Sequence, residues 1–245
     1  MRILRLGIGI LLSLPVLSFV QSQTIPHYKF KFVEHRSLKI PEPSDIVYDS
    51  TTMHFFIVSD HGILLECDTI GNVIRKADKK GMDFEGVEVR GDDVYVSDET
   101  PREVYKYDRK TLKLEATYSV PLGGKLNKGF ESITYNSTKN CFVLVSEKPA
   151  VIYEFDENFK VLGQYSFNDA RDISSARWHQ GKMYLLSDED ACIFKCDPRT
   201  YQPLEKYSVS ILNPEGLCFD SHNNVYITSD DLERLYFFKN LPTQP

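Results

Sequence analysis

Residues 213–230 read NPEGLCFDSHNNVYITSD, and four other stretches of the chain repeat this pattern. Each copy begins with a short polar motif, and a run of alternating apolar residues follows it. The third residues of the five motifs are Ser44, Glu85, Glu131, Ser174 and Glu215, which are 41, 46, 43 and 41 residues apart. Self-similarity at a period of 20–50 residues is typical of repeat architectures.

A second signature follows in every copy, where a serine precedes an acid. The five pairs are Ser59-Asp60, Ser97-Asp98, Ser146-Glu147, Ser187-Asp188 and Ser229-Asp230. A serine in all copies indicates a structural hydrogen bond in each unit. Two matching columns in five copies make accidental repetition a poor explanation.

Short runs of β-branched and aromatic residues fill each unit, such as VYVSDE at residues 94–99. No ten-residue stretch keeps a helical period. Four short strands in a unit of roughly 43 residues are typical of a propeller blade. The sequence therefore predicts an all-β fold, a five-bladed β-propeller of four-stranded antiparallel blades, with a β-sandwich as the alternative. The predicted units lie near residues 42–82, 83–128, 129–171, 172–212 and 213–245.

The fifth unit ends at Pro245 without a fourth strand, whereas the N-terminal region has a strand to spare. That strand is YKFKFV at residues 28–33, within the segment 28–40. We expect it to close the ring as the outer edge of the last blade, because closure removes an open edge.

Residues 1–22 have the pattern of a secretory signal peptide. Arg2 and Arg5 precede an apolar stretch that ends at Val20, and small residues precede a cleavage site before Gln23. The stretch is short for a transmembrane helix, so an uncleaved membrane anchor is the alternative. We expect one monomeric propeller domain over residues 23–245, located in the periplasm, secreted or at the cell surface.

The composition is that of an ordinary globular protein. Of the 245 residues, 42% are hydrophobic, and the formal net charge is −6. An acidic chain without a basic run is a poor candidate for binding a nucleic-acid backbone. The five cysteines fall mostly in apolar columns that predict core packing, although a pair between blades through Cys141 and Cys218 stays open.

Antiparallel pairing places the start of a first strand and the end of a second strand on one face of a blade. Both signatures therefore meet near the mouth of the axial channel. The first column contributes Ser44, Glu85, Glu131, Ser174 and Glu215, and a second ring contributes Asp60, Asp98, Glu147, Asp188 and Asp230. Two such charges about 6 Å apart repel by roughly 3 kcal/mol, which favours a bound cation.

Oxygen ligands suit Ca²⁺ first and Mg²⁺ second. Zinc is disfavoured because neither column holds a His or Cys. The alternative is that the acids bind backbone N–H groups at strand ends or form a solvated rim.

The motifs DFEGVE, GFESITY, DISSARW and PEGLCF resemble those of the SdiA-regulated (YjiK-like) family, and the resemblance covers nearly the whole mature chain. It implies a five-bladed propeller distantly related to NHL repeats, with calcium at a central site and no established catalytic activity. Carried over by motif, the best calcium ligands are Glu85, Glu131 and Glu215. Ser44 and Ser174 hold the matching places in the other blades, and Asp83 and Asp172 lie close by.

These observations predict a non-enzymatic, calcium-binding propeller whose acidic face binds a protein or a small molecule. The alternative function is a metal-dependent lactonase or esterase-type hydrolase that uses the axial metal. No Ser or Cys nucleophile with a His partner stands out. A scaffold whose rim acids are merely solvated is a third possibility.

Overall fold

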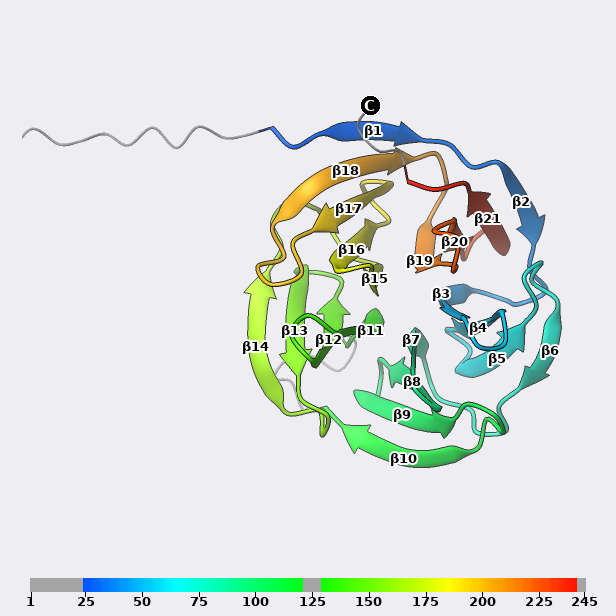
Figure 1. Ribbon diagram of the computed structural model, residues 1–245. Helices are drawn as coiled ribbons and strands as arrows, with labels where there is room; N and C mark the ends of the chain where they lie inside the picture. Colours follow the sequence, from blue (N-terminus) through cyan, green and yellow to red (C-terminus); the bar gives the residue numbers. More distant parts are fainter. Residues whose placement is uncertain (1–23, 121–128, 242–245) are drawn as a thin grey trace, which may run out of the picture.

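A computed structural model describes residues 24–120 and 129–241, so the expected signal peptide lies outside the described residues. The strands form five sheets arranged in a ring around one axis (Figure 1). The described residues contain no helix that is long and apolar enough to cross a membrane. The predicted all-β, five-bladed propeller is confirmed.

Each blade is an antiparallel sheet whose first strand lies nearest the axis (Figure 1). Blade 1 consists of β3 (Pro43–Asp49), β4 (His54–Ser59), β5 (Ile63–Cys67) and β6 (Val73–Lys76). Blade 2 consists of β7 (Phe84–Arg90), β8 (Asp93–Asp98), β9 (Glu103–Asp108) and β10 (Leu114–Ser119). Blade 3 consists of β11 (Ser132–Asn136), β12 (Cys141–Ser146), β13 (Val151–Phe155) and β14 (Val161–Ser166).

The last two blades follow the same order, and both receive a strand from the N-terminal region. Blade 4 consists of β15 (Ser175–His179), β16 (Lys182–Ser187), β17 (Cys192–Cys196) and β18 (Pro203–Val209), with β1 (His27–Phe30) parallel to β18. Blade 5 consists of β19 (Pro214–Phe219), β20 (Val225–Ser229) and β21 (Arg234–Phe238), with β2 (Glu34–Ser37) antiparallel to β21.

Closure of the ring by the N-terminal segment is confirmed, but the closing strand is Glu34–Ser37 and not residues 28–33. The closing strand is exposed at all four positions, so it carries no apolar signature. The more hydrophobic β1 instead adds a fifth strand to blade 4. Phe30 of β1 is 4% exposed and stacks on Phe238 of blade 5 with ring centroids 4.5 Å apart.

Five apolar clusters form the core, and each cluster lies between two neighbouring blades. The alternation along the strands explains this arrangement, because successive side chains of a strand point to opposite faces of its sheet. All five cysteines are buried and free, so Cys141 and Cys218 form no disulfide. The blades are therefore held together by apolar packing, which fixes the residues around the axis.

Candidate metal centre

Ten of the eleven predicted site residues surround one cavity of about 180 Å³ at the axis, which we call the acid cavity. Its lining consists of eight acids and two serines: Ser44, Asp60, Glu85, Glu131, Glu147, Asp172, Ser174, Asp188, Glu215 and Asp230. Nine of them meet because the first column lies at or just before the start of a first strand and the second column lies just after a second strand, and Asp172 lies three residues before β15.

Asp98 departs from the expectation for the second ring, because it does not line the acid cavity. Its carboxylate accepts hydrogen bonds from the backbone N–H groups of Met82 and Asp83, at 2.9 and 3.0 Å. Asp98 is 1% exposed. It therefore holds the loop that enters blade 2. This is the alternative role in which an acid binds backbone N–H groups at a strand end.

Asp172 combines a place in the lining with a structural role. It is fully buried, and it accepts hydrogen bonds from the Ser187 hydroxyl and from the backbone N–H groups of Asp188 and Glu189. Because these donors already stabilise its negative charge, Asp172 has less need of a cation than the three glutamates of the first column.

The serines of the second signature do not repeat one hydrogen bond, and the buried hydroxyl of Ser97 makes none with a described residue. Ser59 and Ser229 both donate to a carbonyl of the loop that enters their own blade, those of Pro41 and Leu212 at 2.6 Å. In blade 4, Ser187 donates to Asp172 instead. The same serine position thus serves different local partners.

The three glutamates of the first column have strongly perturbed acidities. Burial, followed by repulsion from Glu99 and Glu147, raises the pKa of Glu131 to about 8. Burial, followed by repulsion from neighbouring acids, also raises the pKa values of Glu85 and Glu215 well above the usual range. Desolvation and like-charge repulsion both disfavour the ionised form.

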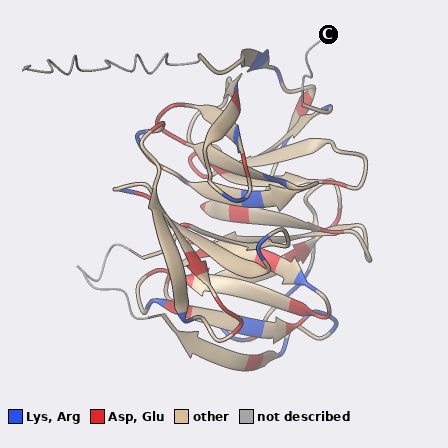
Figure 2. Ribbon diagram, turned by 60° about the vertical axis from the view of Figure 1, so that its left-hand side comes forward, with Lys and Arg blue, Asp and Glu red and all other residues tan. Residues whose placement is uncertain are grey.

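No described residue forms a hydrogen bond or an ion pair with the carboxylates of Glu85, Glu131 or Glu215, and the described lining of the acid cavity holds no Lys or Arg. In contrast, Lys and Arg are interspersed with Asp and Glu over the strands and loops elsewhere (Figure 2). The acid cavity is therefore a concentration of negative charge that the surrounding lining does not neutralise.

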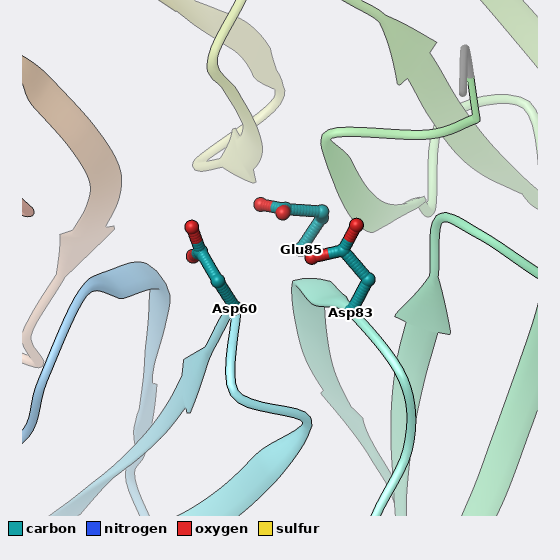
Figure 3. Close-up of side chains that lie close together, drawn as sticks. All are labelled: Asp60, Asp83 and Glu85. Carbon is teal, nitrogen blue, oxygen red and sulfur yellow. The ribbon is translucent and has the colours of Figure 1, made fainter.

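Three carboxylates converge on one side of the cavity, where blades 1 and 2 meet. Asp60, which follows β4, faces Asp83 and Glu85 at the start of β7 (Figure 3). One oxygen from each carboxylate lies within 4.8 Å of the other two. Two oxygens bound to one Ca²⁺ at about 2.4 Å lie at most about 4.8 Å apart, so this spacing is compatible with a shared ion.

A buried salt-bridge network lies on the axis below the acid cavity, and we call it the axial network. Arg177 donates to both oxygens of Asp45 at 3.1 and 3.0 Å and to Glu88 at 3.1 Å. It also donates to the backbone carbonyls of Ile46, Val87 and Leu217. Its charge is thus balanced by two carboxylates of its own layer.

The axial network was not predicted from the sequence. Asp45, Glu88 and Arg177 all lie on first strands, and each side chain points toward the axis. Opposite charges at positions that face the axis were the signal that could have revealed it.

One lysine lies on the rim of the acid cavity between blades 3 and 4. Lys148 forms ion pairs with Glu147 at 2.6 Å and with Glu189 at 2.8 Å. It lies on the side away from Asp60, Asp83 and Glu85. The two sides of the rim therefore differ, because Lys148 supplies a positive charge only between blades 3 and 4.

A family model described as SdiA-regulated matches residues 20–239. The chain belongs to the SdiA-regulated family. This match spans all five blades of the SdiA-regulated propeller and includes every residue that lines the acid cavity.

Solved structures show the same fold at low sequence identity. A glutaminyl cyclase from Myxococcus xanthus is 13% identical with a TM-score of 0.70, over 86% of this SdiA-regulated chain and 97% of that chain. A protein of unknown function from Bacteroides caccae is 10% identical with a TM-score of 0.57, over 77% and 70%. A virginiamycin B lyase from Staphylococcus aureus is 12% identical with a TM-score of 0.51, over 81% and 66%.

Proposed function

We propose that the acid cavity binds a divalent cation, Ca²⁺ in preference to Mg²⁺, and that the metal-loaded face binds a protein or small-molecule ligand outside the cytoplasm. The observation that carries the proposal is the convergence of Glu85, Glu131 and Glu215 in a cavity whose lining supplies no cationic side chain. A bound cation would replace the missing positive charge.

The donor chemistry fits Ca²⁺. The ion takes about six to eight oxygen ligands in flexible geometry, and the lining offers carboxylates and the hydroxyls of Ser44 and Ser174. No His or Cys belongs to that lining, which disfavours zinc. Glu85, Asp60 and Asp83 are the first candidates as ligands, because their oxygens already lie within the span of one ion.

Thermal unfolding of residues 23–245 in EDTA, and then with added Ca²⁺ or Mg²⁺, tests the metal assignment. A ligand at 100 times its Kd adds about 2.7 kcal/mol to the free energy of unfolding. At about 2–4 °C per kcal/mol for a domain of this size, the midpoint should rise by roughly 5–11 °C. Ca²⁺ should produce this rise, and Mg²⁺ should produce a smaller one.

Glu85→Gln should abolish the rise, whereas Glu115→Gln, which changes an exposed acid of β10 outside the acid cavity, should preserve it. No shift with either ion would overturn the metal assignment. An equal rise in both variants would place the ion elsewhere.

An enzymatic alternative has one specific observation in its favour. The lining contains eight acids, so a carboxylate could remain free to act as a general base beside a metal that polarises a carbonyl. The alternative is a lactonase or esterase-type hydrolase. Turnover of a lactone panel with Ca²⁺, lost in Glu85→Gln and Glu215→Gln, would support it. A peptide with an N-terminal glutamine belongs in the assay because a fold neighbour is a glutaminyl cyclase.

Export is proposed from the N-terminal sequence alone. Expression of the full chain, followed by fractionation and N-terminal sequencing, should give a protein outside the cytoplasm that begins at Gln23. An intact Met1 in the membrane fraction would instead favour the uncleaved anchor.

A further inference from the structure

In three blades, a large side chain from the turn before the outer strand fills the gap to the preceding blade. These side chains belong to Leu112, Phe159 and Tyr201, with φ values of 53°, 56° and 60°. They are at most 3% exposed and belong to the apolar clusters between neighbouring blades. We call the spaces between blades 1 and 2, 2 and 3, and 3 and 4 gaps 1–2, 2–3 and 3–4. Positive φ is uncommon outside glycine, so the three residues mark one repeated structural position.

Blade 5 lacks this turn, because its outer strand β2 comes from the other end of the chain. A cavity of about 250 Å³ lies in gap 4–5, and we call it the aromatic cavity. Its apolar lining consists of Tyr184, Tyr207, Phe219 and Leu241, and its polar lining includes Lys195, Gln180, Asn223 and Asn240. It lies on the face opposite the acid cavity, since it also includes His179 at the far end of β15.

The walls of the aromatic cavity are fixed by packing. Phe219 stacks on His179 with ring centroids 4.3 Å apart and planes 6° apart, and its centroid lies 4.6 Å from that of Tyr184. Tyr184, Tyr207 and Phe219 are 6%, 1% and 7% exposed. The aromatic walls are therefore fixed before any ligand arrives, which is typical of small-molecule sites, and a small part of the Tyr184 and Phe219 side chains is exposed.

In gap 3–4, the side chain of Tyr201 occupies the space that is open in gap 4–5. There the ring of Tyr201 packs edge-on against Tyr165 at 5.0 Å, and its hydroxyl donates to Glu154 at 2.6 Å. Lys195 holds the place of Glu154 in the next blade, because Glu154 pairs with Val143 of β12 and Lys195 pairs with Tyr184 of β16. The open gap thus offers an ammonium group where the filled gap offers a carboxylate.

We propose that the aromatic cavity binds a small aromatic acid, with its ring against Tyr184 and Phe219 and its carboxylate at the ammonium group of Lys195. Lys195 now forms an ion pair with Glu205 at 2.8 Å. An ammonium group has three donors, so it can hold both carboxylates. This site is independent of the proposed metal centre, and neither result bears on the other.

Titration of residues 23–245 with benzoate tests the proposal by NMR. Benzoate should bind at least tenfold more tightly than benzylamine, which has the opposite charge, and than cyclohexanecarboxylate, which lacks the aromatic ring. Its ring protons should give intermolecular NOEs to the methyl groups of Leu241 and none to those of Leu112, which lies in filled gap 1–2. Absence of the NOEs to Leu241 would overturn the proposal.

Lysine variants supply a matched control. Lys195→Met should weaken benzoate binding at least fivefold, whereas Lys106→Met should change it less than twofold. Lys106 holds the same position in blade 2, where it pairs with Tyr95 beside the gap that Phe159 fills. Equal affinities of the two variants would contradict a role for the Lys195 charge.

Glu205→Gln separates the effect of charge from a loss of folding. Removal of the carboxylate that competes for Lys195 should tighten benzoate binding at least twofold. Opposite changes in Lys195→Met and Glu205→Gln cannot come from a general loss of structure. Weakening in both variants would overturn the electrostatic part of the proposal.

Discussion

Two layers of carboxylates share the propeller axis, a buried one and a partly exposed one that lines the acid cavity, and they differ in how their charge is balanced. In the axial network, Asp45 and Glu88 surround the guanidinium group of Arg177. In the acid cavity above it, Glu85, Glu131 and Glu215 have no such partner among the described lining residues. A charge that is withdrawn from water without a partner is costly. The lower layer contains its own cation, whereas the upper layer lacks one and therefore favours binding a cation.

The largest expected effect comes from removing the cation of the complete layer. Arg177→Met should lower the free energy of unfolding by about 3–5 kcal/mol, because it leaves two buried carboxylates unpaired. Denaturant unfolding in EDTA measures it. Arg171→Met is the control, since the exposed Arg171 pairs with Glu189 and Asp190 on the rim, and an exposed ion pair contributes little to stability, so the denaturation midpoint should stay nearly unchanged.

A loss of less than about 1 kcal/mol in Arg177→Met would contradict the view that the axial network depends on this arginine. The double variant Arg177→Met with Asp45→Asn should recover part of the loss, because it removes one of the unpaired charges.

The incomplete layer should make the metal-free protein less stable as the pH rises. The pKa of Glu131 is raised to about 8, against an ordinary value near 4.5. Between these values the folded state binds more protons than the unfolded state, so the free energy of unfolding falls with pH. In EDTA, the free energy of unfolding should fall by about 3 kcal/mol between pH 5 and pH 8, which lowers the melting midpoint by roughly 6–12 °C.

Saturating Ca²⁺ should flatten this dependence, because the cation takes the place of the bound protons. Glu131→Gln should reduce the dependence without metal, and the raised pKa values of Glu85 and Glu215 should preserve the remainder. A metal-free melting midpoint that rises over the same pH range would show that folding does not raise the pKa values of these acids.

The repeat made both the fold and the acid cavity predictable, because it aligns one residue per blade at each height along the axis. Glu85, Glu131 and Glu215 could be placed together for this reason. The closing strand could not be identified, since β2 is polar and exposed and only its backbone ladder with β21 determines its place. The axial network and the aromatic cavity were also missed, because both depend on differences between blades rather than on the shared pattern.

The smallest expected effect distinguishes two acids that the repeat treats as equivalent. Asp60 lines the acid cavity, whereas Asp98 binds the backbone N–H groups of Met82 and Asp83. Asp98→Asn should lower the free energy of unfolding by about 1 kcal/mol, because it weakens charge-assisted hydrogen bonds, and it should leave the Ca²⁺ affinity unchanged. Asp60→Asn should weaken Ca²⁺ binding at least tenfold in calorimetric titration. A similar loss of affinity in both variants would show that Asp98 also contributes to the metal centre, from the rim of blade 2.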